Sequence, residues 1–289
     1  MCKKILITGA KGMLGTVLCP FFEKYNILAI DKDNGDITTK NSLAGVIGGF
    51  DFDAVVHCAA YTNVDKAEDK PEHAFIINKD GTANVIDCLK NKDCLFIYIS
   101  TDYVFDGEKK SLYTEEDTPN PLSVYAKSKL EGEKIAAKID KHVIIRTSWL
   151  FGPKGRNFVS TIAQLAKEKK ELKVVDDQAG SPTYTLDLAK AIADIVEIYF
   201  TKGIKPGIYN VTNTGFCTWF ELASYIIKEA GFKTALIPIK SEQSGRKAKR
   251  PKNSRLSKEK FKGLSGYYLP GWQDAVSDYL ENYVFKEKG

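Results

Sequence analysis

The chain has 289 residues, of which 43% are hydrophobic and 27% charged, and its formal net charge is +5. This composition is ordinary for a globular protein with a buried core, and so small a charge does not favour a nucleic-acid partner. No stretch approaches the roughly 18 apolar residues of a membrane helix. The apolar stretch within the start MCKKILITGA is too short for the apolar region of a secretory signal.

The six cysteines are scattered and form no Cys-x-x-Cys pair. Several lie within apolar runs, where a thiol behaves as a small hydrophobic group. This usage is typical of a reducing compartment, so we expect a cytoplasmic protein without structural disulfides and without a metal site. The densest basic run, residues 247–252, is short enough to be an ordinary surface segment.

The first half of the chain alternates short apolar runs with longer helical patterns. Strands are predicted at residues 4–8, 27–31, 54–59, 95–100 and 143–147. Most of these runs are apolar throughout rather than alternating, which is typical of parallel strands buried on both faces. Helices are predicted over residues 71–90 and 123–138. The repeated βαβ order predicts an α/β fold with a doubly wound parallel sheet of the Rossmann type.

The first helix is expected to begin near Gly12, with its apolar face made by residues such as Leu14, Val17 and Phe21. Pro20 falls inside this pattern, where it removes a hydrogen bond and clashes with the preceding turn. We therefore expect a kink or an early end to this helix.

Glycines follow the first predicted strand at the spacing G-x-x-G-x-x-G, as Gly9, Gly12 and Gly15. Glycine lets the backbone turn tightly and approach a pyrophosphate, and the following helix offers unpaired N–H groups. The position between an apolar strand and an apolar helix face predicts dinucleotide binding.

Asp31 ends the second predicted strand, 31 − 9 = 22 residues after Gly9. A carboxylate there can accept a hydrogen bond from a ribose 2′-hydroxyl, which favours NADH over NADPH. Lys11 and Lys32 are close enough in sequence to offset the repulsion of a 2′-phosphate. Either cofactor is therefore compatible, and a plain turn residue is the alternative reading of Asp31.

Thr101 directly follows the fourth predicted strand, which places a hydroxyl at the edge where doubly wound sheets bind ligands. Tyr125 and Lys129 follow at the spacing i, i+4, so both lie on one helical face. An ammonium beside a phenol lowers the pKa of the phenol, which makes a proton donor for neutral pH. In a chain with 14 tyrosines, such a spacing arises by chance. Together with the glycine loop and Thr101, however, the spacing predicts a catalytic triad of Thr101, Tyr125 and Lys129.

The pattern changes after Trp149. Helices are predicted over residues 158–169 and 186–200, a strand and polar loop over 173–183, and a short strand over 208–211. We expect a dinucleotide-binding domain of residues 1–150, with residues 184–212 returning to its sheet. Residues 151–183 and 213–289 would form a smaller α/β substrate-binding lobe.

Several sequence blocks resemble a known family. The N-terminal TGxxGxxG, the hydroxyl residue after strand four and Tyr-x-x-x-Lys are similar to the extended short-chain dehydrogenases/reductases. Further blocks resemble the dTDP-4-dehydrorhamnose reductases within that group: HCAAYTNVDKAE (57–68), STDYVFDG (100–107), RTSWLFG (146–152), NFV (157–159), VVDDQAGSPT (174–183) and RPKNSRL (250–256).

The resemblance implies that the protein reduces the 4-keto group of dTDP-6-deoxy-L-lyxo-4-hexulose to dTDP-L-rhamnose with NADPH or NADH. Such a reaction belongs to nucleotide-sugar and polysaccharide biosynthesis. Tyr125 would donate the proton, Lys129 would hold the nicotinamide ribose, and Thr101 would orient the carbonyl. The complete set of cofactor contacts expected from the motifs and the resemblance is Gly9, Gly12, Met13, Leu14, Gly15, Asp31, Asp36, Ile37, Ala59, Ala60, Tyr61, Tyr125 and Lys129. The substrate contacts expected are Thr101, Tyr103, Trp149 and Asn157.

Some interpretations stay open. The Trp149 indole could lie with its face beside a sugar ring or pack in a core. The Arg250–Arg255 segment could contact a diphosphate or be a surface loop, whereas His57 reads as a buried core histidine. The chain could also be a nucleotide-sugar epimerase or dehydratase, or a regulatory subunit resembling methionine adenosyltransferase beta. A homodimer is left open, and no metal ligands stand out among only three histidines.

Overall fold

The computed structural model describes residues 2–89 and 93–285, and its centre is a parallel sheet. Within these residues six strands pair in one sheet. In spatial order they are β2 (Asn26–Ile30), β1 (Lys4–Thr8), β3 (Ala54–His57), β4 (Leu95–Thr101), β5 (His142–Thr147) and β10 (Gly207–Asn210). The order reverses between β1 and β3, which is the switch point where such sheets bind ligands. The predicted doubly wound α/β fold is confirmed.

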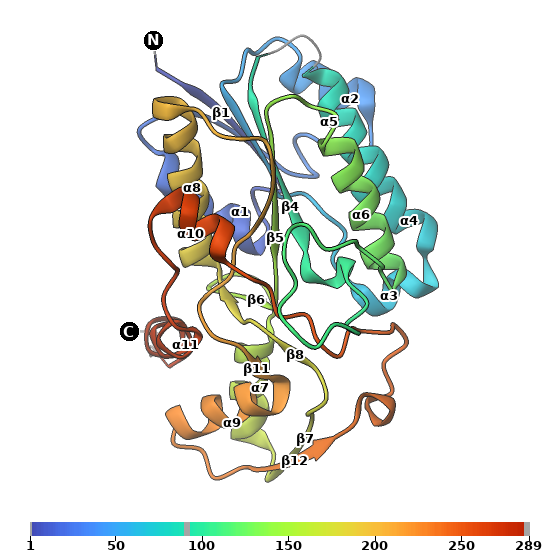
Figure 1. Ribbon diagram of the computed structural model, residues 1–289, viewed down its shortest axis with the longest axis vertical. Coiled ribbons are helices and arrows are strands. Elements are labelled where there is room, and N and C mark those ends of the chain that lie inside the picture. Colours follow the sequence, from blue (N-terminus) through green and yellow to red (C-terminus); the bar gives the residue numbers. More distant parts are fainter. Residues whose placement is uncertain (1, 90–92, 286–289) are drawn as a thin grey trace.

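Helices cover both faces of this sheet (Figure 1). One layer contains α1 (Met13–Leu18), α8 (Thr185–Lys202) and α10 (Glu259–Ser265). The other contains α2 (Lys40–Ile47), α4 (Pro71–Phe75), α5 (Thr82–Cys88) and α6 (Val124–Ala136). Successive strand residues point to opposite faces: Ile5 and Ile7 join the core under the first layer, and Leu6 joins the core under the second. Two apolar cores therefore hold the sheet rigid between its helices.

Two predicted helices are interrupted. Helix α1 ends at Leu18 and continues as a 3-10 turn, η1 (Cys19–Phe22), which begins around Pro20. The predicted early end is confirmed. The helix predicted over residues 71–90 is confirmed as far as Cys88, but it is not α-helical throughout, because the π-helical turn η2 (Ile76–Gly81) lies between α4 and α5. The last residue of that prediction, 90, lies outside the described residues.

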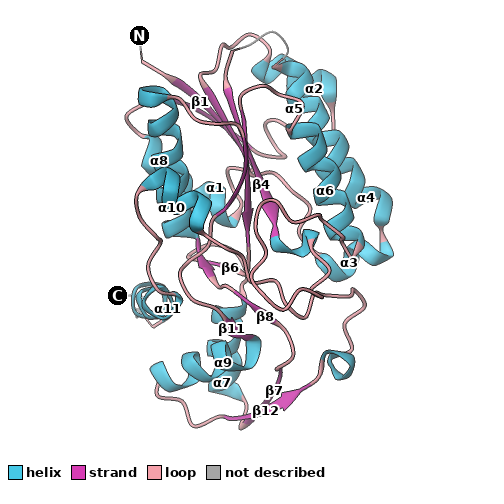
Figure 2. Ribbon diagram, viewed as in Figure 1, coloured by secondary structure: helices cyan, strands magenta, loops and turns pink. Residues whose placement is uncertain are grey.

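A second lobe lies beyond the carboxyl ends of the strands (Figure 2). Its larger elements are α7 (Phe158–Glu168), β7 (Glu171–Val175), α9 (Trp219–Glu229), β12 (Ala235–Ile239), α11 (Trp272–Tyr279) and η5 (Leu280–Val284). Short pairs are β6 (Leu150–Phe151) with β9 (Thr183–Tyr184), and β8 (Ala179–Gly180) with β11 (Cys217–Thr218). The remaining short elements are α3 (Val64–Asp69), η3 (Asp102–Val104) and η4 (Ser241–Ser244).

The second lobe has its own apolar core, to which α7, α9 and α11 contribute. Two segments from the second half of the chain instead return to the main sheet. Helix α8 packs on α1, and β10 pairs in parallel with β5 although the chain leaves the sheet in between. Helix α10 also packs on α8 and β10, through the buried Phe261, although the sequence division puts it in the second lobe. Among the described helices, none combines the length and apolar character needed to span a membrane.

Candidate active site

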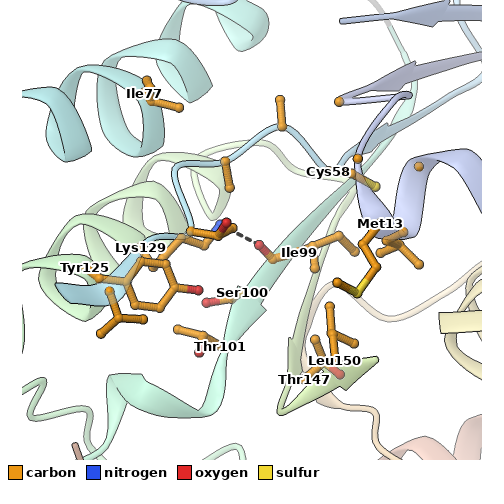
Figure 3. Close-up of a pocket in the computed structure, with 18 of the residues that line it drawn as sticks. Met13, Cys58, Ile77, Ile99, Ser100, Thr101, Tyr125, Lys129, Thr147 and Leu150 are labelled. Atoms are coloured by element: carbon orange, nitrogen blue, oxygen red, sulfur yellow. Dashed lines mark hydrogen bonds between the residues drawn. The ribbon is translucent and has the colours of Figure 1, made fainter. Parts of the chain in front are cut away.

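A cavity of about 770 Å³ opens at the carboxyl ends of the strands, and residues from both lobes line it. Figure 3 shows Tyr125 and Lys129 on one side of it and Met13 and Leu150 on the other. The predicted site residues that line this cavity are Gly9, Gly12, Met13, Leu14, Gly15, Asp31, Asp36, Ile37, Ala59, Ala60, Thr101, Tyr103, Tyr125, Lys129 and Trp149.

The glycine loop is tight at two positions. Gly9 has a φ of +67°, and a Cβ there would lie 2.6 Å from the backbone nitrogen of Ala59. A Cβ on Gly15 would lie 2.2 Å from the carbonyl oxygen of Gly9. Only glycine allows this close approach of β1, β3 and α1. Helix α1 begins at this loop, and its first backbone N–H groups have no partner within the helix. The loop therefore fits a dinucleotide pyrophosphate.

Asp31 and Asp36 occupy the far end of the cavity. The Asp31 carboxylate accepts the backbone N–H groups of Lys11 and Lys32, each at 2.8 Å. The Lys11 ammonium pairs with Asp33 rather than with Asp31. Asp36 accepts the hydroxyl and the backbone N–H of Thr38, and these hydrogen bonds hold its pKa below the usual range. The Asp36 carboxylate is thus stabilised in its charged form.

Lys129 is almost completely buried at the other end. Helix α6 begins at the cap Ser123, whose hydroxyl accepts the N–H of Ala126, and the next turn brings Lys129 over β4. The Lys129 ammonium donates to the Ile99 carbonyl at 2.6 Å (Figure 3) and lies 4.1 Å from the centre of the Tyr98 ring. Burial lowers the pKa of Lys129 to about 7, against the attraction of Glu133. Its charge therefore responds to pH near neutrality.

The expectation that Lys129 lowers the pKa of Tyr125 is wrong for this structure. Burial raises the pKa of Tyr125, and the Thr101 hydroxyl opposes this shift only in part. The ammonium is directed to the Ile99 carbonyl instead. Tyr125 consequently keeps its phenolic proton at neutral pH, so it is a proton donor rather than a phenolate.

Asp102 is a cavity residue that the sequence did not single out. It is 2% exposed, and its Oδ1 accepts the Thr101 hydroxyl at 3.1 Å. The same Thr101 oxygen accepts the N–H of Tyr103 at 3.2 Å. Burial raises the pKa of Asp102 to about 7. Its neighbours in the STDY block are visible in the sequence, but its burial and the nearby Ser254 hydroxyl are not.

Trp149 joins the two lobes through an aromatic stack. It is the non-glycine residue with a positive φ, +48°, among those described. Its indole lies parallel to that of Trp219, with centroids 3.5 Å and planes 7° apart. A Cβ on Gly180 would lie 2.5 Å from the Trp149 ring, so this glycine makes room for it. Trp149 does line the cavity, but it presents one indole face to Trp219, which the sequence did not predict as a site residue.

Two predicted site residues are not brought into the cavity lining. Asn157 is the buried N-cap of α7, where its side chain accepts the N–H of Ser160 and donates to Gly152 and Tyr279. The Tyr61 ring packs edge-on against His73.

Other residues considered in the sequence have structural partners. Arg250 forms a two-pronged ion pair with Asp65. His57 is confirmed as a buried core histidine, because its two ring nitrogens pair with Thr8 and Thr82. In residues 2–89 and 93–285, no three His, Cys, Asp or Glu side chains gather as a metal site would require.

The parallel sheet, the glycine loop at its switch point, and Tyr125 with Lys129 beside it define a nicotinamide-dependent oxidoreductase of the short-chain type. Comparisons with known proteins agree. The family model described as RmlD substrate binding domain matches residues 3–285. The chain belongs to this family, which confirms the resemblance seen in the sequence.

Individual relatives cover nearly the whole chain. It is 39% identical to the spore coat polysaccharide biosynthesis protein SpsK of Bacillus subtilis, over 96% of this chain and 97% of that protein. It is 37% identical to a dTDP-4-dehydrorhamnose reductase of Aggregatibacter actinomycetemcomitans, over 95% and 97%. The crystal structure of dTDP-4-dehydrorhamnose reductase from Bacillus anthracis in complex with NADP matches with a TM-score of 0.92 and 37% identity, over 97% of this chain and 99% of that one.

Proposed function

We propose that this protein reduces the 4-keto group of dTDP-4-dehydrorhamnose, giving dTDP-L-rhamnose, with NADPH or NADH. The observation that carries the proposal is the meeting of Thr101, Tyr125 and Lys129 at one cavity beside a tight glycine loop. The names of the relatives above support the choice of substrate.

The proposed chemistry assigns one task to each side chain. A nicotinamide cofactor supplies the hydride when bound. Tyr125 donates its phenolic proton to the oxygen of the substrate carbonyl, and its raised pKa means that the proton is present at neutral pH. Thr101 donates its hydroxyl hydrogen to Asp102 in this structure, and it orients the substrate oxygen when that hydrogen turns from Asp102 to the carbonyl. Lys129 holds the nicotinamide ribose through an ammonium fixed by the Ile99 carbonyl.

The two ligands are proposed to bind in different parts of the cavity. Gly9, Gly12, Met13, Leu14, Gly15, Asp31, Asp36, Ile37, Ala59 and Ala60 would contact the cofactor from the main sheet. Tyr103 and the edge of Trp149 would contact the sugar. The separate core of the second lobe, distinct from the two cores that flank the main sheet, supports a division into a dinucleotide-binding domain and a substrate-binding lobe, with α10 assigned to the former.

The test is an assay of NADPH and NADH oxidation with the dTDP-linked 4-keto-6-deoxy sugar, with the product identified by NMR. We expect one cofactor to be consumed for each sugar reduced. Oxidation of neither cofactor would contradict the proposal. Tightly bound cofactor that is recycled, with conversion of an unreduced nucleotide sugar, would instead identify an epimerase or dehydratase. Light scattering of the same sample distinguishes a monomer from the homodimer left open by the sequence.

A further inference from the structure

A loop of the second lobe lies beside the glycine loop of the main sheet. It connects β6 to α7, and its residues 152–156 precede Asn157, the N-cap of α7. Gly155 has a φ of +74°, and a Cβ added there would lie 3.5 Å from the Cε of Met13. Met13 follows Gly12 and begins α1. The second lobe therefore comes close to the segment that is proposed to bind the cofactor pyrophosphate.

Both ends of this loop are held by one buried side chain. The Asn157 Nδ2 donates to the Gly152 carbonyl at 3.1 Å and to the Tyr279 hydroxyl at 3.0 Å. Its Oδ1 accepts the N–H of Ser160 at 2.9 Å, which fixes the start of α7. The base of the loop is thus well defined, and so is the position of Arg156, the residue directly before the cap.

Arg156 lines the cavity, although its side chain is otherwise exposed. Its Nε donates to the Thr161 hydroxyl at 3.5 Å, which is a weak hydrogen bond. Among the described residues no carboxylate pairs with its guanidinium, whereas Arg146 and Arg250 each have a carboxylate partner. The charge and the terminal N–H groups of Arg156 can therefore serve a ligand in the cavity.

The other lysine and arginine side chains of the cavity lining have different surroundings. Lys11 pairs with Asp33, and Lys129 donates to a backbone carbonyl of β4. Lys32 follows Asp31 at the adenosine end. The part of the main sheet that the structure describes therefore leaves the glycine loop without an unpaired cation.

The cofactor pyrophosphate needs such a cation, because each of its phosphates carries a negative charge. The glycine loop offers backbone N–H groups, which carry only partial charges. A guanidinium adds a full charge and a planar pair of N–H donors that match two phosphate oxygens. Arg156 supplies this group from the second lobe.

We propose that Arg156 binds the pyrophosphate of the nicotinamide cofactor, so that both lobes hold the cofactor. The inference rests on the proposed function for the identity of this ligand. The diphosphate of a nucleotide sugar has the same chemistry, but the closeness of Gly155 to Met13 favours the cofactor.

The experiment titrates Arg156→Gln with NADPH and with NADH and follows the fluorescence of the reduced cofactor. Both cofactors contain the pyrophosphate, so both Kd values should rise by the same factor, about 10-fold. Arg156→Lys keeps the charge but loses the planar pair of donors, and its Kd values should rise about threefold. Added salt should weaken binding by the native protein more steeply than binding by Arg156→Gln. Because the side chain is exposed, the melting temperature should stay within about two degrees of the native value.

Lys154→Gln is the matched control. Lys154 lies in the same loop and is exposed, but it does not line the cavity. The same loss of charge should therefore change both Kd values by less than about twofold. A titration with dTDP tests the substrate side, and its Kd in Arg156→Gln should stay within about twofold of the native value.

Unchanged Kd values in Arg156→Gln, or an equal loss in Lys154→Gln, would overturn the inference. Weaker binding of dTDP with normal binding of NADPH and NADH would also overturn it and assign Arg156 to the substrate diphosphate. A loss confined to NADPH would assign Arg156 to the 2′-phosphate instead. If the native protein binds neither NADPH nor NADH, the proposed function fails together with this inference, whereas normal native binding that Arg156→Gln leaves intact overturns this inference alone.

Discussion

The ionisable groups at the two ends of the cavity differ in their exposure and in their hydrogen-bond partners. At the proposed adenosine end, Asp31 and Asp36 are partly exposed and accept backbone N–H groups, and these bonds lower the pKa of Asp36. At the reacting end, Lys129 and Asp102 are buried, and each has a pKa near 7 because its charged form is poorly solvated. The two ends therefore differ in kind: the carboxylates of the adenosine end have fixed polar partners, whereas the buried groups of the reacting end change their charge near neutral pH.

The largest effect is expected at the reacting end. Tyr125→Phe removes the proposed proton donor but keeps the ring, so turnover should fall about 10²-fold or more. The Kd for NADPH should stay within about twofold, because the phenol is expected to act mainly on the substrate. Steady-state kinetics and a fluorescence titration measure the two quantities. Near-normal turnover would remove Tyr125 from the mechanism.

Lys129→Met tests whether one buried group can serve both chemistry and binding. Turnover should fall about 10-fold or more, and NADPH binding should weaken. In the native protein the Kd for NADPH should rise as the pH increases through about 7, because Lys129 then loses its proton. The variant should show no such rise. A pH-dependent Kd that persists in Lys129→Met would assign the titration to another group.

A smaller effect is expected at the adenosine end. Asp31→Ala removes a carboxylate placed to accept the ribose 2′-hydroxyl, and one such hydrogen bond is worth about 1 kcal/mol. NADH binding should therefore weaken about fivefold, whereas NADPH binding should stay equal or improve. Titrations with both cofactors give the ratio. An equal loss for the two would mean that Asp31 only holds the Lys11 and Lys32 backbone in place.

The smallest effect concerns stability. Because the pKa of Asp102 is raised by folding, the neutral carboxyl stabilises the protein at acid pH, and this contribution is lost as the pH rises through about 7. Asp102→Asn resembles the neutral acid, so above that pH it should melt a few degrees higher than the native protein. At acid pH the difference should vanish. The exposed Asp140→Asn is the control, and a constant difference at all pH values would exclude titration of Asp102 as its cause.

The parts of the fold set by local pattern could be predicted from the sequence. The first five strands of the sheet appear as apolar runs, and their observed ends lie within two residues of the predicted ones. The interruption at Pro20 follows from one residue's missing N–H. By contrast, no local pattern reveals the π-helical turn at Ile76–Gly81 or the pairing of its Asn78 with the distant backbone of Tyr61.

The site shows the same limit. The glycine loop and the Tyr125–Lys129 spacing are legible as motifs, but the pKa of each group depends on burial by the rest of the chain. The sequence suggested that Lys129 acidifies Tyr125, whereas burial dominates and raises the pKa of Tyr125. The stack of Trp149 on Trp219 joins segments from different lobes, so the sequence around either residue does not predict their contact.

The position of β10 has a consequence for synthesis of the chain. It pairs with β5, yet 210 − 147 = 63 residues separate the ends of the two strands. A nascent chain emerging from the ribosome therefore presents β5 as an open, largely apolar edge until β10 follows, and such edges template association with other chains. Translation arrested between these strands should accordingly yield chains that require a chaperone to stay dispersed.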